Sequence, residues 1–204
     1  MSKATLKEML ASRDWLLADG ATGTNYFTAG IQSGDAPEFW NVDHPDRVGT
    51  LHRQFIENGA DIILTNSFGG TSCRLKLHHS EDRVVELNRA AASIAREEAD
   101  RADRAVVVAG SIGPTGDLLQ PLGELNLADA EHSFAEQALA LAEGGVDVIW
   151  LETMSCKEEL QAAGAGSKQT GLPVVATMTF DTKGRTMMGV PPQQLVDLYK
   201  ATVP

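Results

Sequence analysis

Short apolar runs alternate with longer stretches of helical periodicity along this sequence, and this alternation restricts the possible folds more than any other feature. Strand-sized runs rich in Val, Ile and Leu, separated by amphipathic helices, are typical of a parallel sheet with helical crossovers. The expected strands are Trp15–Asp19, Asp61–Asn66, Ala105–Gly110, Val146–Glu152 and Pro173–Phe180. The expected helices are Asp46–Asn58, Glu81–Arg101, Leu127–Glu143, Lys157–Gln169 and Pro192–Ala201. The sequence therefore predicts an α/β fold built from five βα units.

A weak internal repeat supports this interpretation. The segment Glu57–Ser67 recurs in outline as Glu143–Thr153, each with a helix-ending glycine, an aspartate, an apolar run and then polar residues. The glycine suits a left-handed turn after a helix, and the aspartate begins the strand. No linker interrupts the series, so residues 1–204 are expected to form a single domain. The longest irregular stretches are expected at Thr22–Pro45 and Gly113–Asn126, where polar residues and glycines are frequent.

The charge balance disfavours two classes of partner. The 204 residues include 28 Asp and Glu against 17 Lys and Arg, for a net charge of -11. Nucleic acids and anionic membranes require a basic face, so neither is an expected partner. The segment Met1–Leu10 predicts a short amphipathic helix rather than a signal peptide, and no apolar run approaches the ~20 residues of a membrane span. Cys73 and Cys156 form no closely spaced pair, which favours a reducing cytoplasm over a disulfide framework.

Polar residues follow each expected strand. In a barrel of parallel strands the active site lies at the C-terminal ends of the strands, so these residues would meet at one rim. They are Asp19–Thr24, Thr65–Phe68, Ser111–Pro114, Glu152–Ser155, and Thr179 with Asp181. Two carboxylates, Asp19 and Glu152, would share this rim with hydroxyls and backbone amides. Such a pair suits the ammonium group of a small substrate, because a desolvated cation needs paired anions.

Structural alternatives stay open for several of these positions. Asp19 and Gly20 are equally consistent with an ordinary strand-to-turn step, whereas Glu152 is costly to bury without a partner. The stretch Ser155–Glu158 has the spacing of a capping box, and Cys156 is expected to be a small buried residue rather than a nucleophile. The glycines at 20–23 and 110–116 lack the spacing of a P-loop or of a dinucleotide-binding loop, so they give only a weak phosphate signal.

The histidines show no metal-binding pattern. His78 and His79 are adjacent and project to different sides of a helix or strand, so a solvated pair is expected. His44, His52 and His132 lie near expected helix starts or on polar helix faces, without a suitably spaced companion. No histidine-based metal centre is therefore predicted.

Five short motifs stand at or beyond the expected strand ends. They are Leu17-Ala-Asp-Gly-Ala-Thr-Gly-Thr24, Thr65-Asn-Ser-Phe-Gly-Gly70, Ala109-Gly-Ser-Ile-Gly-Pro114, Trp150-Leu-Glu-Thr-Met154 and Gly184-Arg-Thr186. Each is weak by itself, but the five in this order are specific, and together they resemble the homocysteine S-methyltransferase family. That family includes betaine–homocysteine methyltransferase and the homocysteine-binding module of cobalamin-dependent methionine synthase. The resemblance runs from about Trp15 to the last residue.

The resemblance implies a (β/α)8 TIM-type barrel in which zinc, held by three cysteine thiolates, binds the sulfur of homocysteine as a nucleophilic thiolate. A free thiol is mostly protonated at neutral pH because its pKa is ~8.5, and a coordinating metal removes that proton. The thiolate then attacks an activated methyl group, and methionine forms. The methyl donor stays open between betaine, a methylated sulfonium compound and a methyl-corrinoid.

By the same resemblance, Asp19 and Glu152 hold the amino group of homocysteine, and Gly20 is the backbone position next to the substrate. Further rim positions complete the expected substrate site: Thr65, Asn66 and Ser111. No catalytic residue is assigned. The zinc cysteines of the family come from the sixth strand end and from a later Cys-Cys pair, so the cysteines of this chain do not match them and no metal ligand is expected here.

The length conflicts with a closed barrel. Five βα units occupy the chain, and three more would need roughly 30 residues each. Because an open sheet exposes a strand edge, we expect the chain to be the N-terminal part of a longer domain, or to be completed by a partner or a second copy. The first hypothesis is a zinc-dependent methyltransferase whose zinc-binding part is missing from this chain. The second is a non-catalytic half-barrel that docks to a corrinoid-carrying protein or to another copy. A barrel enzyme acting on a phosphorylated or pterin substrate through the glycines at 110–116 is a lesser alternative.

Overall fold

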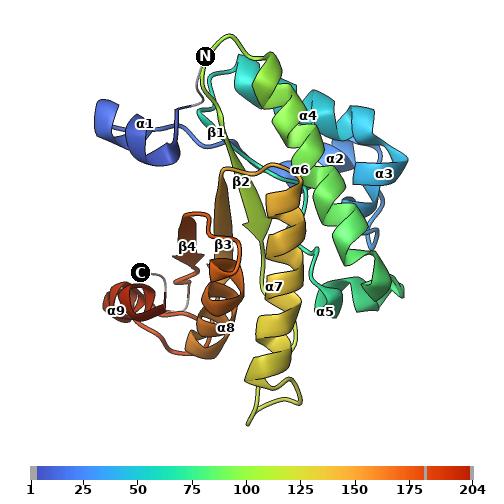
Figure 1. Ribbon diagram of the computed structural model, residues 1–204. Helices are drawn as coiled ribbons and strands as arrows, with labels where there is room; N and C mark the ends of the chain where they lie inside the picture. The colour runs from blue at the N-terminus through green and yellow to red at the C-terminus, as the bar shows by residue number, and fades with distance from the viewer. Residues whose placement is uncertain (1–3, 182, 203–204) are drawn as a thin grey trace.

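The computed structural model describes residues 4–181 and 183–202, and a parallel sheet lies at its centre (Figure 1). The sheet has four strands in the order β1-β2-β3-β4, so strands that follow one another in the chain are neighbours. They are β1 (Ile62–Leu64), β2 (Val107–Ile112), β3 (Val148–Met154) and β4 (Val174–Met178). All three pairings are parallel, which confirms the expected α/β class with helical crossovers.

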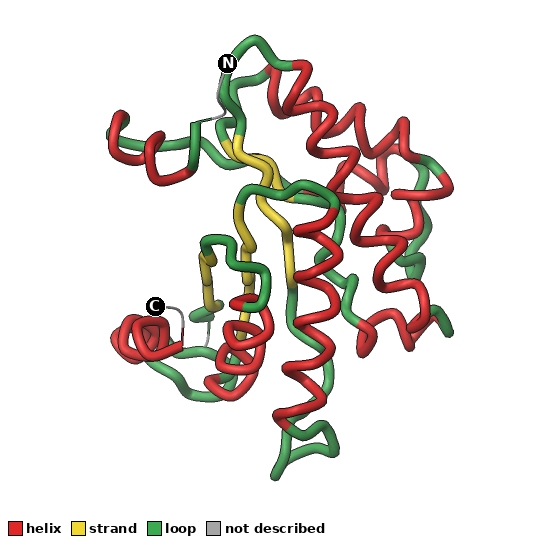
Figure 2. The backbone as a smooth tube through the Cα atoms, viewed as in Figure 1, coloured by secondary structure: helices red, strands yellow, loops and turns green. Residues whose placement is uncertain are grey.

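Helices follow each strand and cover one face of the sheet (Figures 1 and 2). The longer helices are α4 (Pro45–Glu57), α6 (Val84–Arg101), α7 (Leu127–Glu143), α8 (Lys157–Lys168) and α9 (Pro192–Thr202). The shorter ones are α1 (Leu6–Ser12), α2 (Thr22–Ala29), α3 (Trp40–Asp43) and α5 (Ser72–Leu75), with 3-10 turns η1 (Pro37–Phe39), η2 (Lys76–His78) and η3 (Glu81–Arg83). Helices α6, α7 and α8 pack side by side, and α4 and α9 contact the two ends of this layer. The five predicted helices are confirmed to within three residues at each end.

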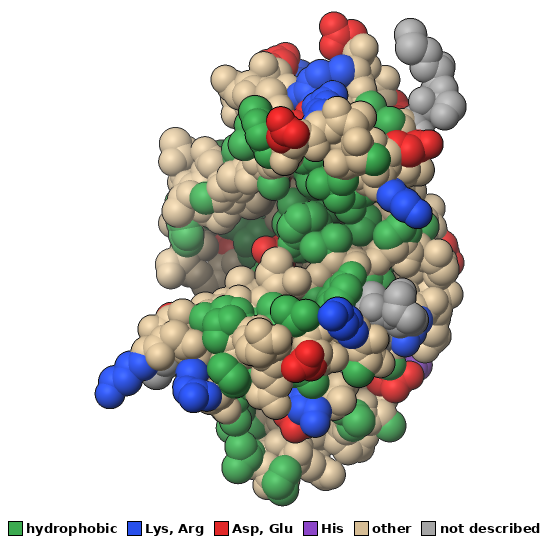
Figure 3. Space-filling view, turned by 90° about the vertical axis from the view of Figure 1, so that its left-hand side faces the viewer, with side chains coloured by type: hydrophobic (Ala, Val, Ile, Leu, Met, Phe, Trp, Pro, Cys, Tyr) green, Lys and Arg blue, Asp and Glu red, His purple; other side chains and the backbone are tan. Residues whose placement is uncertain are grey.

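The two faces of the sheet are buried by different elements. Side chains on the outer face, such as Ile63, Val108 and Ile149, pack into the main core beneath the helices. Their neighbours on the inner face form a smaller cluster with Met9 of α1, which is the short N-terminal helix predicted from the sequence. The alternation of the two sets along each strand is the period of two that a pleated strand imposes. Figure 3 shows the side of the molecule that carries α1, β4 and α9, where hydrophobic side chains gather in a hollow.

The internal repeat encodes the same local structure twice. Gly59 and Gly145 both have positive φ, 101° and 99°, where a residue with a Cβ would be strained. The following aspartates use their carboxylates to bind the backbone of the neighbouring segment: Asp61 accepts from Leu17 N at 3.1 Å, and Asp147 accepts from Val108 N at 2.8 Å. Each repeat therefore ends a helix and ties the next strand to the one before it.

Two of the expected features are wrong in detail. The segment Trp15–Asp19 forms only one parallel bridge, between Ala18 and Ile62, because its backbone bonds to β1 are confined to Leu17 and Asp19. The stretch Thr22–Pro45, expected to be irregular, contains α2, η1 and α3. Its few apolar residues pack into a small cluster against α4, and the surrounding polar residues hide that pattern in the sequence.

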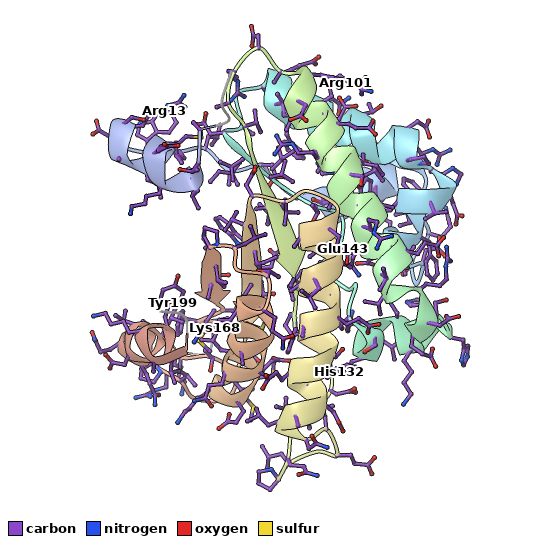
Figure 4. The ribbon with its side chains drawn as sticks, in the orientation of Figure 1. Arg13, Arg101, His132, Glu143, Lys168 and Tyr199 are labelled. Atoms are coloured by element: carbon purple, nitrogen blue, oxygen red, sulfur yellow. The ribbon has the colours of Figure 1, made fainter. Side chains whose placement is uncertain are left out.

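Two side chains also differ from expectation. His52 lies on α4 at an interface with α6 and is 2% exposed, so it is not on a polar helix face. The cap of α8 is Cys156 rather than Ser155: its Sγ accepts from Glu159 N at 3.4 Å, and no capping box forms. His132, by contrast, lies exposed on α7 as expected (Figure 4). Over the residues described, no helix combines the length and the apolar character that a membrane crossing requires.

Candidate functional site

A pocket of about 480 Å³ opens at the C-terminal ends of β1, β2 and β3. Its lining includes every residue that the sequence placed in the substrate site: Asp19, Gly20, Thr65, Asn66, Ser111 and Glu152. The parallel sheet explains this convergence, because the ends of its strands lie along one edge. Thr179 and Asp181, also at an expected strand end, do not line this pocket.

Asp19 is positioned by the edge of β1. Its backbone N–H donates to Ile62 O at 2.9 Å, and its carboxylate Oδ2 accepts from Leu64 N at 2.8 Å. Burial raises the pKa of Asp19 to about 7, the nearby charge of Glu152 acts in the same direction, and the hydrogen bond from Leu64 opposes both. Asp19 is therefore half-protonated near neutral pH while no cation lies beside it.

Glu152 is aimed into the pocket by an irregularity in β3. Leu151 pairs with Ala176 and Met154 with Met178, so β3 has one extra residue between these two pairs. Thr153 takes that place with φ 58°, a conformation that costs a β-branched residue about 1–2 kcal/mol. Burial raises the pKa of Glu152, while a hydrogen bond from Ser111 Oγ opposes the shift. A strained bulge at the end of a strand is therefore what presents this carboxylate.

The other predicted rim side chains are held by the protein itself. Thr65 Oγ1 accepts from Ser111 N at 3.0 Å and shares a hydrogen bond with Ser67 Oγ at 2.6 Å. The amide nitrogen of Asn66 donates to Pro37 O at 2.7 Å and to Asn41 Oδ1 at 3.0 Å. These side chains shape the wall. Asp19 and Glu152 line the same pocket, near enough for the charge of Glu152 to raise the pKa of Asp19.

Four charged or titratable residues in this pocket were not foreseen: Asp35, Glu38, Arg74 and His78. Glu38 is 5% exposed, and its Oε1 accepts from Gly69 N at 2.6 Å. Burial raises the pKa of Glu38, and the charges of Arg74 and His78, which also line the pocket, oppose that shift. None of the four follows a strand directly, so a search of strand ends misses them. The one sequence signal is an acidic residue set between Ala36 and the aromatic pair at 39–40.

The described residues do not fit a zinc site. They contain no group of three or more His, Cys, Asp or Glu side chains arranged to hold a metal ion. Cys73 and Cys156 are partly buried, and burial raises the pKa of both thiols, which disfavours the thiolate that zinc binds. No step of the chemistry is therefore assigned to a metal held by this part of the chain.

Comparison with known proteins adds a family relationship. The sequence model described as homocysteine S-methyltransferase matches residues 16–203. The methionine synthase of Mycobacterium tuberculosis is 34% identical over 189 residues, which cover 85% of this chain and 16% of that protein. Betaine–homocysteine S-methyltransferase 1 of Mus musculus is 30% identical over 212 residues, which cover 98% of this chain and 49% of that protein. The chain thus spans less than half the length of either curated relative.

A solved structure shares the fold. The oxidized form of the homocysteine methyltransferase MmuM from Escherichia coli has a TM-score of 0.83 to this chain, at 21% sequence identity. The match covers 97% of this chain and 73% of that one. The metallated form of the same protein gives an equal TM-score over 74% of its chain. The parallel sheet and its helices therefore correspond to about three quarters of a homocysteine methyltransferase fold.

Proposed function

Because the chain belongs to the homocysteine S-methyltransferase family, a family of enzymes, we propose that its pocket holds homocysteine while a methyl group is transferred to the homocysteine sulfur to form methionine. The observation that carries this proposal is the pair of partly buried carboxylates, Asp19 and Glu152, that line one pocket. Neither makes an ion pair with a cationic side chain of the described residues.

An ammonium group supplies what these carboxylates lack. It carries a positive charge and three N–H donors, and it favours the ionised form of any carboxylate that it contacts. Binding the ammonium group of homocysteine between Asp19 and Glu152 therefore lowers the pKa of both. Gly20 lines the pocket beside Asp19, and a Cβ there would lie 3.2 Å from the ring of Phe55. The substrate is thus held by its amino end.

The reaction itself requires a deprotonated sulfur. The sulfur forms a bond to the methyl carbon while the bond between that carbon and the donor breaks, and the thiol proton is lost to solvent or base. The resemblance implies that zinc activates the sulfur, and the described residues offer no ligand set for it. We propose that the metal ligands come from βα units beyond those described, which would also complete a (β/α)8 barrel.

A second candidate is an assembly module without activity of its own. The hollow, hydrophobic side of the molecule in Figure 3 and the partly buried Trp150 and Val175 on the inner face favour it. In this case a second copy or another protein covers the sheet. Light scattering after size-exclusion chromatography tests the form of this candidate in which a second copy covers the sheet: such a module is a dimer or larger, and a monomer would rule that form out.

Calorimetric titration of the chain with homocysteine tests the proposed function. Asp19→Asn and Glu152→Gln should each weaken binding by about 10- to 100-fold, because each removes a charge-assisted hydrogen bond to the ammonium group. Glu124→Gln, which changes an exposed carboxylate in the loop before α7, is the matched control and should bind as the wild type does. Unchanged affinity in the two pocket variants would rule out the roles assigned to them.

Metal analysis tests the assignment of the zinc ligands. The purified chain should contain well under one zinc ion per molecule after dialysis against a weak chelator. Substoichiometric zinc follows from the lack of a ligand group among the described residues. One tightly bound zinc ion per chain would contradict the account, and replacing Cys73 and Cys156 by Ser would then identify the ligands.

A further inference from the structure

A second pocket, of about 810 Å³, lies beside the first. Its walls come from the loop after β2, the start of α8 and the segment before α9, including the exposed side chains of Leu122 and Met187. The two pockets share two lining residues, Phe68 and Arg74. These two side chains therefore form the partition between the proposed homocysteine pocket and its larger neighbour.

Arg74 differs from every other arginine of the described chain. Each of the others donates at least one hydrogen bond or ion pair to a carboxylate or a backbone carbonyl, as Arg47 does to Ala29 O and Arg185 does to Gly189 O. Within the same residues, no hydrogen bond or ion pair is made by the guanidinium of Arg74. Its donors, five N–H groups in a fixed planar fork, thus face the pockets unused.

The position of this guanidinium is fixed by close packing. Gly116 has φ 83°, and a Cβ built on it would lie 2.8 Å from Nη1 and 3.1 Å from Cδ of Arg74. The side chain therefore lies across the bare backbone of Gly116. Glu38 is near enough for the charge of Arg74 to affect its pKa, but no ion pair forms between the two side chains. The oxygen Oε1 of Glu38 is already bound to Gly69 N.

The chemistry of the ligand calls for such a group. An amino acid carries its carboxylate on the carbon next to its amino nitrogen, so a ligand held by Asp19 and Glu152 brings an anion into the same pocket. Of the side chains that line that pocket, only Arg74 and His78 can carry a positive charge. A guanidinium binds a carboxylate through two parallel N–H···O bonds, which gives both strength and orientation.

We infer that Arg74 is a carboxylate-binding residue at the junction of the two pockets, with Gly116 as the position that makes room for its guanidinium. The carboxylate belongs either to homocysteine in the first pocket or to a carboxylate-bearing methyl donor in the second. The identity of the amino acid in this inference rests on the proposed function. The test of the inference probes the carboxylate of the ligand, whereas the test of the proposed function probes its amino group.

Fragments of homocysteine separate the two ends of the molecule. The probe 3-mercaptopropylamine keeps the thiol and the ammonium group, and 4-mercaptobutyrate keeps the thiol and the carboxylate. Trimethylglycine serves as a carboxylate-bearing donor. Each is titrated calorimetrically into the chain and into Arg74→Gln, Gly116→Ala and a control, Arg89→Gln, which changes an exposed arginine on α6. Thermal melting of each variant checks that the fold is kept.

Arg74→Gln should weaken binding of a carboxylate probe roughly tenfold or more and leave 3-mercaptopropylamine within about twofold. Gly116→Ala should give a smaller loss of the same pattern, because it displaces the guanidinium without removing it. A loss for 4-mercaptobutyrate assigns the carboxylate to homocysteine, and a loss for trimethylglycine alone assigns it to the donor. The inference would be overturned by any of three results: an equal loss of affinity for all probes, no loss of affinity for either carboxylate probe, or a wild type that binds neither carboxylate probe. Failure of the proposed function would instead appear with the amine probe in Asp19→Asn and Glu152→Gln.

Discussion

Buried and partly buried carboxylates occur in two settings in this molecule, and the contrast between them separates structure from function. At the N-terminal end of the sheet, Asp61 is bonded to Arg13 at 2.6 Å and to Arg104 at 3.3 Å. At the C-terminal ends of the strands, Asp19 and Glu152 have no cationic partner among the described side chains, and burial raises the pKa of both. Where a carboxylate serves the fold, an arginine neutralises it; where it lines the pocket, the cation is left to a ligand.

Glu98 of α6 shows how strongly a cationic partner changes the pKa of a buried carboxylate. Burial alone would raise the pKa of Glu98, but the hydrogen bonds and charges of Arg53 and Arg101 lower it overall. Arg53 makes two bonds to this carboxylate, both at 2.9 Å. Glu98 is thus ionised in the fold without help from any ligand, whereas Asp19, with a pKa of about 7, is only half ionised near neutral pH.

The largest effect is expected from removing a structural carboxylate. Asp61→Asn should lower the free energy of unfolding by about 3 kcal/mol, because it leaves two arginines without their anion and weakens the tie to Leu17 N. Urea unfolding at pH 7 measures this change. A loss below about 0.5 kcal/mol, the size of a neutral surface substitution, would erase the distinction between the two settings.

The corresponding change in the pocket should have the opposite sign. The pKa of Asp19 is raised from its ordinary value of 3.8 to about 7 in the folded protein, so the folded state holds the proton more tightly than the unfolded chain does. The resulting contribution to the free energy of unfolding is fully present below pH 3.8 and is lost as the pH rises through 7. Asp19→Asn should therefore stabilise the ligand-free protein by about 2 kcal/mol at pH 8 and leave it unchanged at pH 4. Unfolding curves of both proteins at the two pH values test this, and a destabilised variant at pH 8 would refute it.

The smallest effect is expected at His52, a buried side chain that has no hydrogen-bond partner and lines neither of the two pockets at the strand ends. Neither ring nitrogen of His52 has a hydrogen-bond partner, and burial lowers its pKa from 6.5 to about 4 despite the attraction of Glu98. As the pH falls below 6.5, the unfolded chain binds a proton before the folded one does, so stability falls. The wild type should lose about 1 kcal/mol relative to His52→Phe between pH 7 and pH 5.5.

Equal pH dependence of wild type and His52→Phe over this range would show that His52 is protonated in the fold. A confirmed difference would sharpen the comparison, because it would show that an unpartnered buried group indicates a ligand only where it opens onto a cavity. Asp19 and Glu152 meet that condition, and His52 lines neither of the two pockets at the strand ends.

Much of this arrangement could be predicted from local patterns. The helix Leu127–Glu143 was predicted at its observed bounds, because an Asn precedes it and a pair of glycines follows it. The convergence of Asp19 and Glu152 followed from strand order alone, since parallel strands end at one edge. The family resemblance was confirmed by the match over residues 16–203.

The features that sequence reasoning missed depend on contacts between distant segments. The helices within 22–45 form because Tyr26 and Trp40 pack against α4, which no local period reveals. His52 is buried by its position at the contact between α4 and α6. Glu38 and Arg74 reach the pocket from short elements beside the strands rather than from strand ends. The zinc requirement and the substrate roles stay predictions.

Proton release on ligand binding tests the central claim most directly. Titration of the chain with homocysteine at pH 6, in buffers of different ionisation enthalpy, counts the protons released per ligand bound. If the ammonium group binds between Asp19 and Glu152, about one proton should leave Asp19 for each ligand, and the release should disappear in Asp19→Asn. Binding without proton release, or with the same release in Asp19→Asn, would contradict the claim that the carboxylate of Asp19 anchors the substrate.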